Sequence, residues 1–237
     1  MGRMLSSVRP GVAKAMALSI HRIYESIFII WRRKRFTLFR SLLAPGPAQH
    51  LLDVGGGPGF WTQHPVLLGR IDTLNIYPIK WNNDSFPEYH IRTFTGDGCA
   101  LNFPDASYDI AFSNSVIEHV GDWQRQQAFA REIRRVGRSV WVQTPAFECP
   151  IEPHYVAPFV HWLPKAVQRK LVRWLTPWGM LEKPSKSQVD EMVKTTRLLT
   201  KREMRELFPD CQIRTERLLG IIPKSYIAIR KNGQGVT

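Results

Sequence analysis

The chain has 237 residues, of which 43% are hydrophobic, and this is enough to bury the core of one elaborated α/β domain. Its three cysteines (Cys99, Cys149 and Cys211) lie far apart without a CxxC pair, so neither a disulfide framework nor a zinc site is encoded, and a cytoplasmic protein is expected. Residues 1–50 carry nine Lys and Arg against one acidic residue, residues 51–120 three against eight, and residues 121–237 twenty-one against eleven. Basic ends around an acidic centre could attract an anionic substrate, a membrane surface or nucleic acid.

The N-terminal part carries apolar residues at helical spacing. This spacing predicts a helix over Lys14–Arg35 and a second, short helix over Phe36–Leu43. No apolar run is long enough to span a bilayer or to act as a secretory signal. The first helix could cover the functional site or lie on an anionic membrane as a peripheral contact, and we expect the cover because Glu25 and Ser26 interrupt its apolar face.

Strand and helix patterns alternate after a proline-rich break at residues 44–49. The predicted strands are His50–Val54, Asp72–Tyr77, Ser107–Asn114 and Arg138–Pro145, and the predicted helices lie near Phe60–Leu68 and over Trp123–Val136. Such alternation is typical of a parallel, doubly wound sheet.

The last third of the chain interrupts this alternation and then resumes it. Residues 147–199 are irregular and rich in proline and tryptophan, with an amphipathic helix predicted at Lys165–Leu175. A helix over Thr200–Phe208 follows, in which Thr200 and Glu203 form a capping box, and two final strands come from Cys211–Leu219 and Ser225–Arg230. We therefore expect a single domain with a helical cover (1–43), a cofactor-binding core (44–146), a lid or substrate insertion (147–199) and a C-terminal helix with two strands (200–237).

A glycine-rich turn, "DVGGGPGF", follows the first strand of the core. A strand ending in Asp53, followed by Gly55, Gly57 and Gly59, is typical of a nucleotide-type cofactor site at the carboxyl edge of a parallel sheet. A dinucleotide site would use G-x-G-x-x-G, which leaves a nicotinamide-dependent oxidoreductase as a weaker alternative. A phosphate-binding loop is excluded because no G-K-[ST] follows.

The turn and a second segment, "GDGCALNFPDASYDIAFSNSVIEHV" (Gly96–Val120), resemble the class I S-adenosylmethionine-dependent methyltransferases, and in particular the type-11 group. The resemblance covers roughly His50–Pro145 and Thr200–Arg230. It implies a Rossmann-like, doubly wound, mostly parallel seven-stranded sheet, with N-terminal helices and a helical insertion after the fifth strand. It also implies S-adenosylmethionine as the cofactor and no metal ion.

The resemblance assigns cofactor-binding roles to residues near the ends of the first four strands. In chain order they are Asp53, Gly55, Gly57, Gly59, Asn75, Asp97, Gly98 and Ser113. Asp97 would accept a hydrogen bond from the adenine amine, although it could equally be a plain turn residue. Asn75 stands where the family carries an acid that binds the ribose, so Asn75→Asp is expected to keep or improve cofactor affinity.

Methyl transfer is an in-line displacement that needs positioning and, for some acceptors, removal of a proton. The candidate bases are Glu118, His119, Glu152 and His154. Each has a structural role as its alternative, and His154 is favoured because its proline-rich turn follows the fifth strand. We expect methylation of a small molecule at oxygen, with an apolar or lipid-linked acceptor as one option. An RNA methyltransferase is disfavoured because no NPPY-type segment is present, and a non-catalytic domain of the same fold stays an alternative.

Overall fold

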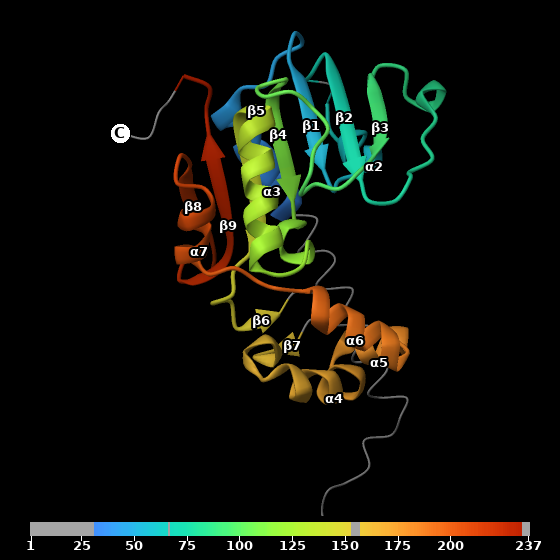
Figure 1. Ribbon diagram of the computed structural model, residues 1–237, viewed down its shortest axis with the longest axis vertical. Coiled ribbons are helices and arrows are strands. Elements are labelled where there is room, and N and C mark those ends of the chain that lie inside the picture. Colours follow the sequence, from blue (N-terminus) through green and yellow to red (C-terminus); the bar gives the residue numbers. More distant parts are fainter. Residues whose placement is uncertain (1–30, 66, 153–156, 234–237) are drawn as a thin grey trace, which may run out of the picture. The chain divides into compact units, whose positions relative to one another are not determined.

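Seven strands form one sheet in the computed structural model, which describes residues 31–65, 67–152 and 157–233 (Figure 1). The sheet order is β3-β2-β1-β4-β5-β9-β8. The strands are β1 (His50–Val54), β2 (Arg70–Asn75), β3 (Ile91–Thr95), β4 (Tyr108–Asn114), β5 (Gly137–Pro145), β8 (Gln212–Leu218) and β9 (Ile222–Arg230). The first five are parallel, and β9 runs antiparallel to both β5 and β8. The predicted doubly wound, mostly parallel seven-stranded sheet is confirmed.

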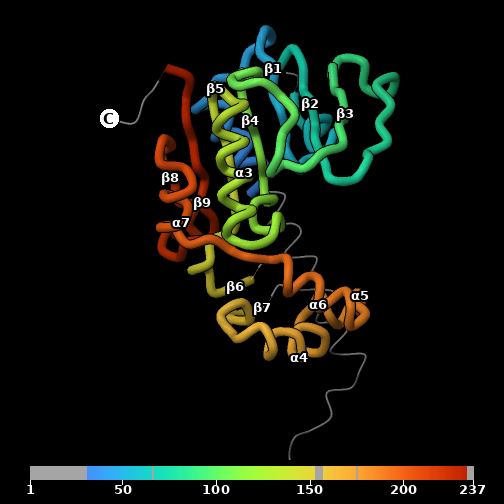
Figure 2. The backbone as a smooth tube through the Cα atoms, in the orientation of Figure 1, coloured from blue at the N-terminus to red at the C-terminus, as the bar shows by residue number. Residues whose placement is uncertain are grey.

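The sheet belongs to a unit made of residues 38–149 and 195–237. Helix α3 (Trp123–Val136) packs on one face through Phe129 and Ile133, which are fully buried. On the other face lies the end of a helical segment, residues 31–43, shown in blue in Figure 2. Its Phe39 contacts Phe112 and Trp141 edge to face, with ring centroids 5.4 and 5.5 Å apart. Apolar helices therefore cover both faces, as a parallel sheet requires.

Several predicted elements are confirmed at or close to their expected bounds. Helix α3 begins where the Asp122 side chain accepts from the amide of Arg125. Helix α7 (Lys201–Leu207) carries the predicted capping box between Thr200 and Glu203. Local capping chemistry was enough to place the start of α7.

Three expectations were wrong in their bounds. Helix α2 covers only Pro58–Trp61 instead of a longer helix near Phe60–Leu68, because a proline starts it at its first position and Pro65 would break its continuation. Strand β2 lies two residues earlier than predicted. No break separates Phe36–Leu43 from the helix before it: residues 31–43 are helical throughout, and Lys14–Ile30 lies outside the described residues.

The sheet unit is discontinuous in sequence, and its two segments meet after β5. Ala146 forms a parallel bridge with Leu199, and the amide of Phe147 donates to the carbonyl of Leu199 at 3.0 Å. The chain therefore leaves the sheet and returns to it at one place.

The other unit comprises residues 1–37 and 150–194, of which 31–37, 150–152 and 157–194 are described. Its elements are β6 (Ile151–Glu152), β7 (Ala157–Pro158), a 3-10 turn (Val160–Trp162), α4 (Lys165–Leu175), α5 (Pro177–Glu182) and α6 (Lys186–Thr195). Val172, Val189 and Val193 form the centre of its own small core. Helix α4 has the predicted bounds, whereas the β6–β7 ribbon, α5 and α6 were not predicted.

Within the described ranges, no helix is both long and apolar enough to cross a membrane.

Candidate functional site

The glycine turn after β1 lies where the order of the sheet reverses, between β1 and β4. In open α/β sheets, ligands bind in the crevice outside the carboxyl ends of the strands at such a point. Gly55 has φ of +86°, and a Cβ there would lie 2.5 Å from the methyl groups of Val116. Only glycine fits this position, for reasons both of conformation and of space.

Asp53 lies fully buried beneath the turn. Its Oδ2 accepts from the indole nitrogen of Trp61 at 2.9 Å. Burial raises the pKa of the Asp53 carboxyl to about 7, although the Trp61 hydrogen bond and the nearby Gly56 amide act to lower it. Its Oδ1 meets no donor in good geometry among the described residues. Asp53 therefore holds the turn from below and keeps one acceptor unsatisfied.

Gly57 and Gly59 are the open positions of the turn. Gly57 is the N-cap of α2 with an ordinary extended backbone, and the nearest atom to a Cβ there would be Ile79 Cδ1 at 3.8 Å. A Cβ on Gly59 would meet nothing within 4 Å. Neither the backbone nor the packing of the protein itself requires glycine here, so the space can serve a ligand.

A cavity of about 310 Å³ opens beside the turn. It is lined by residues that follow β1, β2, β3 and β4 and by the first turn of α3, and its polar side chains are Asn75, Asp97, Ser115, His119 and Arg125. The volume is at the lower end of the range for small-molecule sites.

Asn75 ends β2 at one side of this cavity. Its Nδ2 donates to the carbonyl of Gly56 at 2.5 Å, so the amide ties the strand end to the glycine turn. Its Oδ1 is left as the group that can accept from a ligand hydroxyl. Asn75→Asp is therefore no longer expected to keep or improve cofactor affinity, because an aspartate could not donate to the carbonyl of Gly56.

Asp97 lines the cavity together with Arg125. Both carboxylate oxygens accept from Arg125 Nη2, at 3.0 and 2.9 Å, and Oδ1 also accepts from the amide of Cys99. Burial acts to raise the pKa of the Asp97 carboxyl, but these hydrogen bonds and the Arg125 charge outweigh it, and the pKa is lowered. Asp97 is therefore an ionised and oriented acceptor at the cavity.

Gly98 and Ser113 serve the architecture around the cavity. A Cβ on Gly98 would lie 2.8 Å from both Phe129 and Val54, so glycine permits close packing of the cavity floor. Ser113 is fully buried and donates to the carbonyl of Val54 at 2.9 Å, across β4 and β1. It does not line the cavity, whereas its neighbour Ser115 does.

The four candidate bases have different surroundings. His119 lines the cavity, with Nδ1 3.5 Å from the hydroxyl of Thr196. Glu118 is fully buried and accepts from the hydroxyl of Thr144 at 3.0 Å. His154 lies outside the described residues. Glu152 is fully buried in β6. Of the three described candidates, only His119 lines the cavity.

Comparisons with known proteins show what the sequence and the fold are similar to. Residues 52–139 match the model of the methyltransferase domain family, which is the kind of family that the sequence resembles. A protein from Mycobacterium sp. (strain KMS), described as an uncharacterized methyltransferase, is 32% identical over 93 residues, 38% of this chain and 36% of the relative. A similarly described protein from Mycolicibacterium gilvum (strain PYR-GCK) is 31% identical over 116 residues, 47% of this chain and 42% of the relative. The chain thus spans less than half the length of these relatives.

Solved structures with the same fold cover most of the chain at low identity. The N-methyltransferase NodS from Bradyrhizobium japonicum WM9, in complex with S-adenosyl-L-homocysteine, has a TM-score of 0.52 at 12% identity and covers 86% of this chain and 87% of that one. The 1,6-didemethyltoxoflavin-N1-methyltransferase of Burkholderia thailandensis has a TM-score of 0.53 at 14% identity, covering 99% and 94%. At this identity the likeness establishes the class I methyltransferase fold.

Proposed function

We propose that the protein binds S-adenosylmethionine in the cavity and transfers its methyl group to a small molecule. The observation that carries this proposal is the meeting of two polar acceptors, Asn75 and Asp97, with the open glycine turn at the point where the strand order reverses. Two related folds bind the demethylated cofactor, according to the descriptions of their structures.

Each part of the cavity fits one part of this cofactor. The Asp97 carboxylate, which Arg125 keeps ionised, suits the amine of an adenine, and Asn75 Oδ1 suits one ribose hydroxyl. The open space above Gly57, in the turn beside the cavity, suits the amino-acid portion. When bound, the cofactor supplies an electrophilic methyl group on a sulfonium. The residues of the chain hold it, exclude water and orient the acceptor.

We further propose that the acceptor atom is an oxygen and that a histidine takes its proton. His119 is the candidate that lines the cavity, and an imidazole titrates near neutral pH. His154 remains a second proposal for the same role. The insertion at 147–199 is proposed to supply the acceptor-binding residues, because its tryptophans suit an apolar or amphipathic molecule.

Calorimetric titration of the full chain tests the cofactor. S-adenosylmethionine and S-adenosylhomocysteine should bind, and a nicotinamide dinucleotide should not. Gly57→Val should abolish binding, because its side chain would enter the open space of the turn. Binding of the dinucleotide alone would overturn the proposal and favour an oxidoreductase.

Release of S-adenosylhomocysteine in the presence of hydroxylated small molecules tests the base. His119→Ala should lower turnover far more than cofactor affinity, whereas the exposed His90, at the edge of β3, provides the matched control His90→Ala. If His154→Ala is the damaging change instead, the two roles must be exchanged. Cofactor binding without turnover on any acceptor class would favour a non-catalytic binding domain.

A further inference from the structure

Helix α4 exposes apolar residues on the side that faces away from its own core. Its buried side chains include Gln168 and Val172. Val167, Lys170 and Trp174 follow one another at intervals of three and four residues, the spacing of one helical face, and the exposed Leu163 precedes the helix. Val167 is 38% exposed and Trp174 68%. In Figure 1 the labelled elements of this unit lie on one side of α4.

The turn before α4 adds two exposed aromatic rings. Phe159 and Trp162 are 52% and 45% exposed, and their ring centroids lie 5.3 Å apart. Phe159 has φ of +61°, in the left-handed region that a bulky residue rarely adopts. The buried Gln168 side chain donates to the carbonyls of His161 and Leu163, which fixes this turn against α4. The rings are therefore held in place by the structure.

We propose that this surface, made of Phe159, Trp162, Leu163, Val167, Lys170 and Trp174, docks on an anionic lipid bilayer. The charge of the segment is complementary to such a surface: no Asp or Glu occurs between Ala157 and Leu181, whereas α4 alone contains four Lys and Arg. The guanidinium of Arg173 lies 5.1 Å from the centre of the Trp174 ring, so a cation accompanies the most exposed aromatic residue. Tryptophan beside Lys and Arg on one helical face is the composition of helices that lie in the membrane interface.

A lipid surface accounts for this composition better than nucleic acid does. Platforms for single-stranded nucleic acid stack bases on aromatic faces between basic side chains. Here the aliphatic Leu163 and Val167 share the face with the tryptophans, and aliphatic side chains gain most from insertion among acyl chains. The site is distinct from the predicted N-terminal contact at Lys14–Arg35, and it holds whether or not the proposed methyl transfer is correct.

Sedimentation of the full chain with vesicles tests the proposal. Vesicles of equal parts phosphatidylglycerol and phosphatidylcholine should bind the protein, and pure phosphatidylcholine should bind it much less. The double variant Trp162→Ala/Trp174→Ala should lower the partition coefficient at least about tenfold. Lys170→Gln/Arg173→Gln should lower it more than about tenfold at low salt, since each basic residue near the membrane surface contributes about 1 kcal/mol.

The matched control removes the same charge elsewhere. Arg202 and Arg205 are exposed on α7, so Arg202→Gln/Arg205→Gln should change binding less than about twofold if the α4 surface is the contact. All substituted side chains are exposed or partly exposed, and thermal melts of the variants check that the fold is kept.

Three results would overturn the proposal. The first is that the wild-type chain does not bind anionic vesicles. The second is that the charge variants on α4 and on α7 weaken binding equally. The third is that the α4 variants bind as well as wild type, and this result would assign the contact to the N-terminal segment. Binding of single-stranded RNA that the tryptophan variant loses, without vesicle binding, would assign the surface to nucleic acid instead.

Discussion

Two buried carboxylates on neighbouring strands have opposite surroundings. Asp72, in β2, accepts from Arg92 at 2.9 and 2.7 Å and from the hydroxyl of Tyr108 at 2.8 Å, with Arg70 3.3 Å away. Asp53, near the end of β1, accepts from Trp61 and has an oxygen without a partner among the described residues. Both side chains are almost completely buried.

The difference separates a carboxylate that stabilises the sheet, Asp72, from one that lies beneath the glycine turn of the proposed site, Asp53. Buried polar atoms are nearly always hydrogen-bonded, and the surroundings of Asp72 follow that rule. Asp53 departs from this rule beneath the glycine turn, although its side chain does not itself line the cavity. Proteins commonly accept such local departures at functional sites and compensate for them elsewhere. Four experiments test this difference between the two regions.

The largest effect should be the pH dependence that Asp53 imposes on stability. Its pKa is 3.8 in an ordinary setting and about 7 in the folded protein, so the folded state holds a proton that the unfolded state has lost between these values. The free energy of unfolding should therefore fall as the pH rises from about 4 to about 7, by roughly 4 kcal/mol from this group. Asp53→Asn should remove this component. Urea unfolding of both proteins at pH 4 and pH 8 measures it, and equal pH dependence in the two would contradict the assignment.

The next effect concerns Asp72→Ala, which should lower the free energy of unfolding by about 3 kcal/mol. The change leaves the hydroxyl of Tyr108 without its acceptor, while the half-exposed Arg92 can turn to water. Affinity for the cofactor should stay within about twofold of wild type. Asp105→Ala is the control, because its ion pair with Arg135 is mostly exposed and should contribute less than about 1 kcal/mol. If Asp72→Ala and Asp105→Ala lower the free energy of unfolding equally, Asp72 does not have the special stabilising role that its buried hydrogen bonds imply.

A smaller loss, about 2 kcal/mol, is expected for Gly55→Ala, because the added Cβ would meet Val116 and the backbone has positive φ. Cofactor binding should fall with it, since the turn must shift. Gly59→Ala places the same methyl group in open space within α2, and its stability should equal or slightly exceed that of wild type. Thermal unfolding compares the pair. A Gly55→Ala protein with unchanged stability would show that the turn can relax without cost.

The smallest expected effect is about a tenfold loss of cofactor affinity in Asn75→Asp, or 1.4 kcal/mol. A carboxylate cannot donate to the carbonyl of Gly56, and it would place two acceptors 2.5 Å apart. The sequence alone had led us to expect unchanged or better affinity. Asn82→Asp is the control, because the Asn82 side chain only accepts, from the amide of Asp84, and aspartate can do the same. Titration calorimetry measures the cofactor affinity of both variants. Improved affinity in Asn75→Asp would restore the original expectation.

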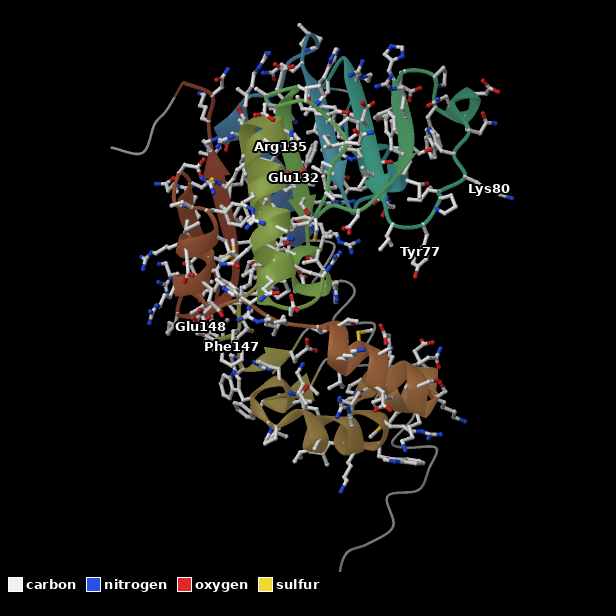
Figure 3. All side chains as sticks on the ribbon, in the orientation of Figure 1. Tyr77, Lys80, Glu132, Arg135, Phe147 and Glu148 are labelled. Carbon is white, nitrogen blue, oxygen red and sulfur yellow. The ribbon has the colours of Figure 1, made fainter. Side chains whose placement is uncertain are left out.

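The order of the strands and helices along the chain could be predicted because the local apolar patterns of the sequence agree with it. Alternating strand and helix patterns placed β1, β4 and α3. The prediction for β2 was misplaced because Ile76 and Tyr77 extend the apolar pattern, although both are largely exposed, and Figure 3 shows Tyr77 pointing away from the sheet. Apolar residues exposed beside a cavity imitate a buried strand, and periodicity alone cannot tell the two apart.

The site could be predicted where the main chain defines it. The turn at Gly55 and the acceptors Asn75 and Asp97 follow strands, and the carboxyl ends of parallel strands gather at one edge. Arg125 was missed, because nothing in the sequence indicates that a helix residue 28 positions later pairs with Asp97. The buried roles of Ser113 and Glu118 likewise depend on tertiary contacts.

The bridge between Ala146 and Leu199 bears on how such a protein can evolve. Because the chain leaves and rejoins the sheet unit at one place, residues 150–194 act as a closed loop on that unit. The entropy cost of closing a loop grows only slowly, by about 0.6 kcal/mol for each doubling of its length. The inserted segment can therefore lengthen, shorten or be exchanged with little penalty to assembly of the sheet. Selection for new partners can act on this segment while the strands and the glycine turn stay under a separate constraint.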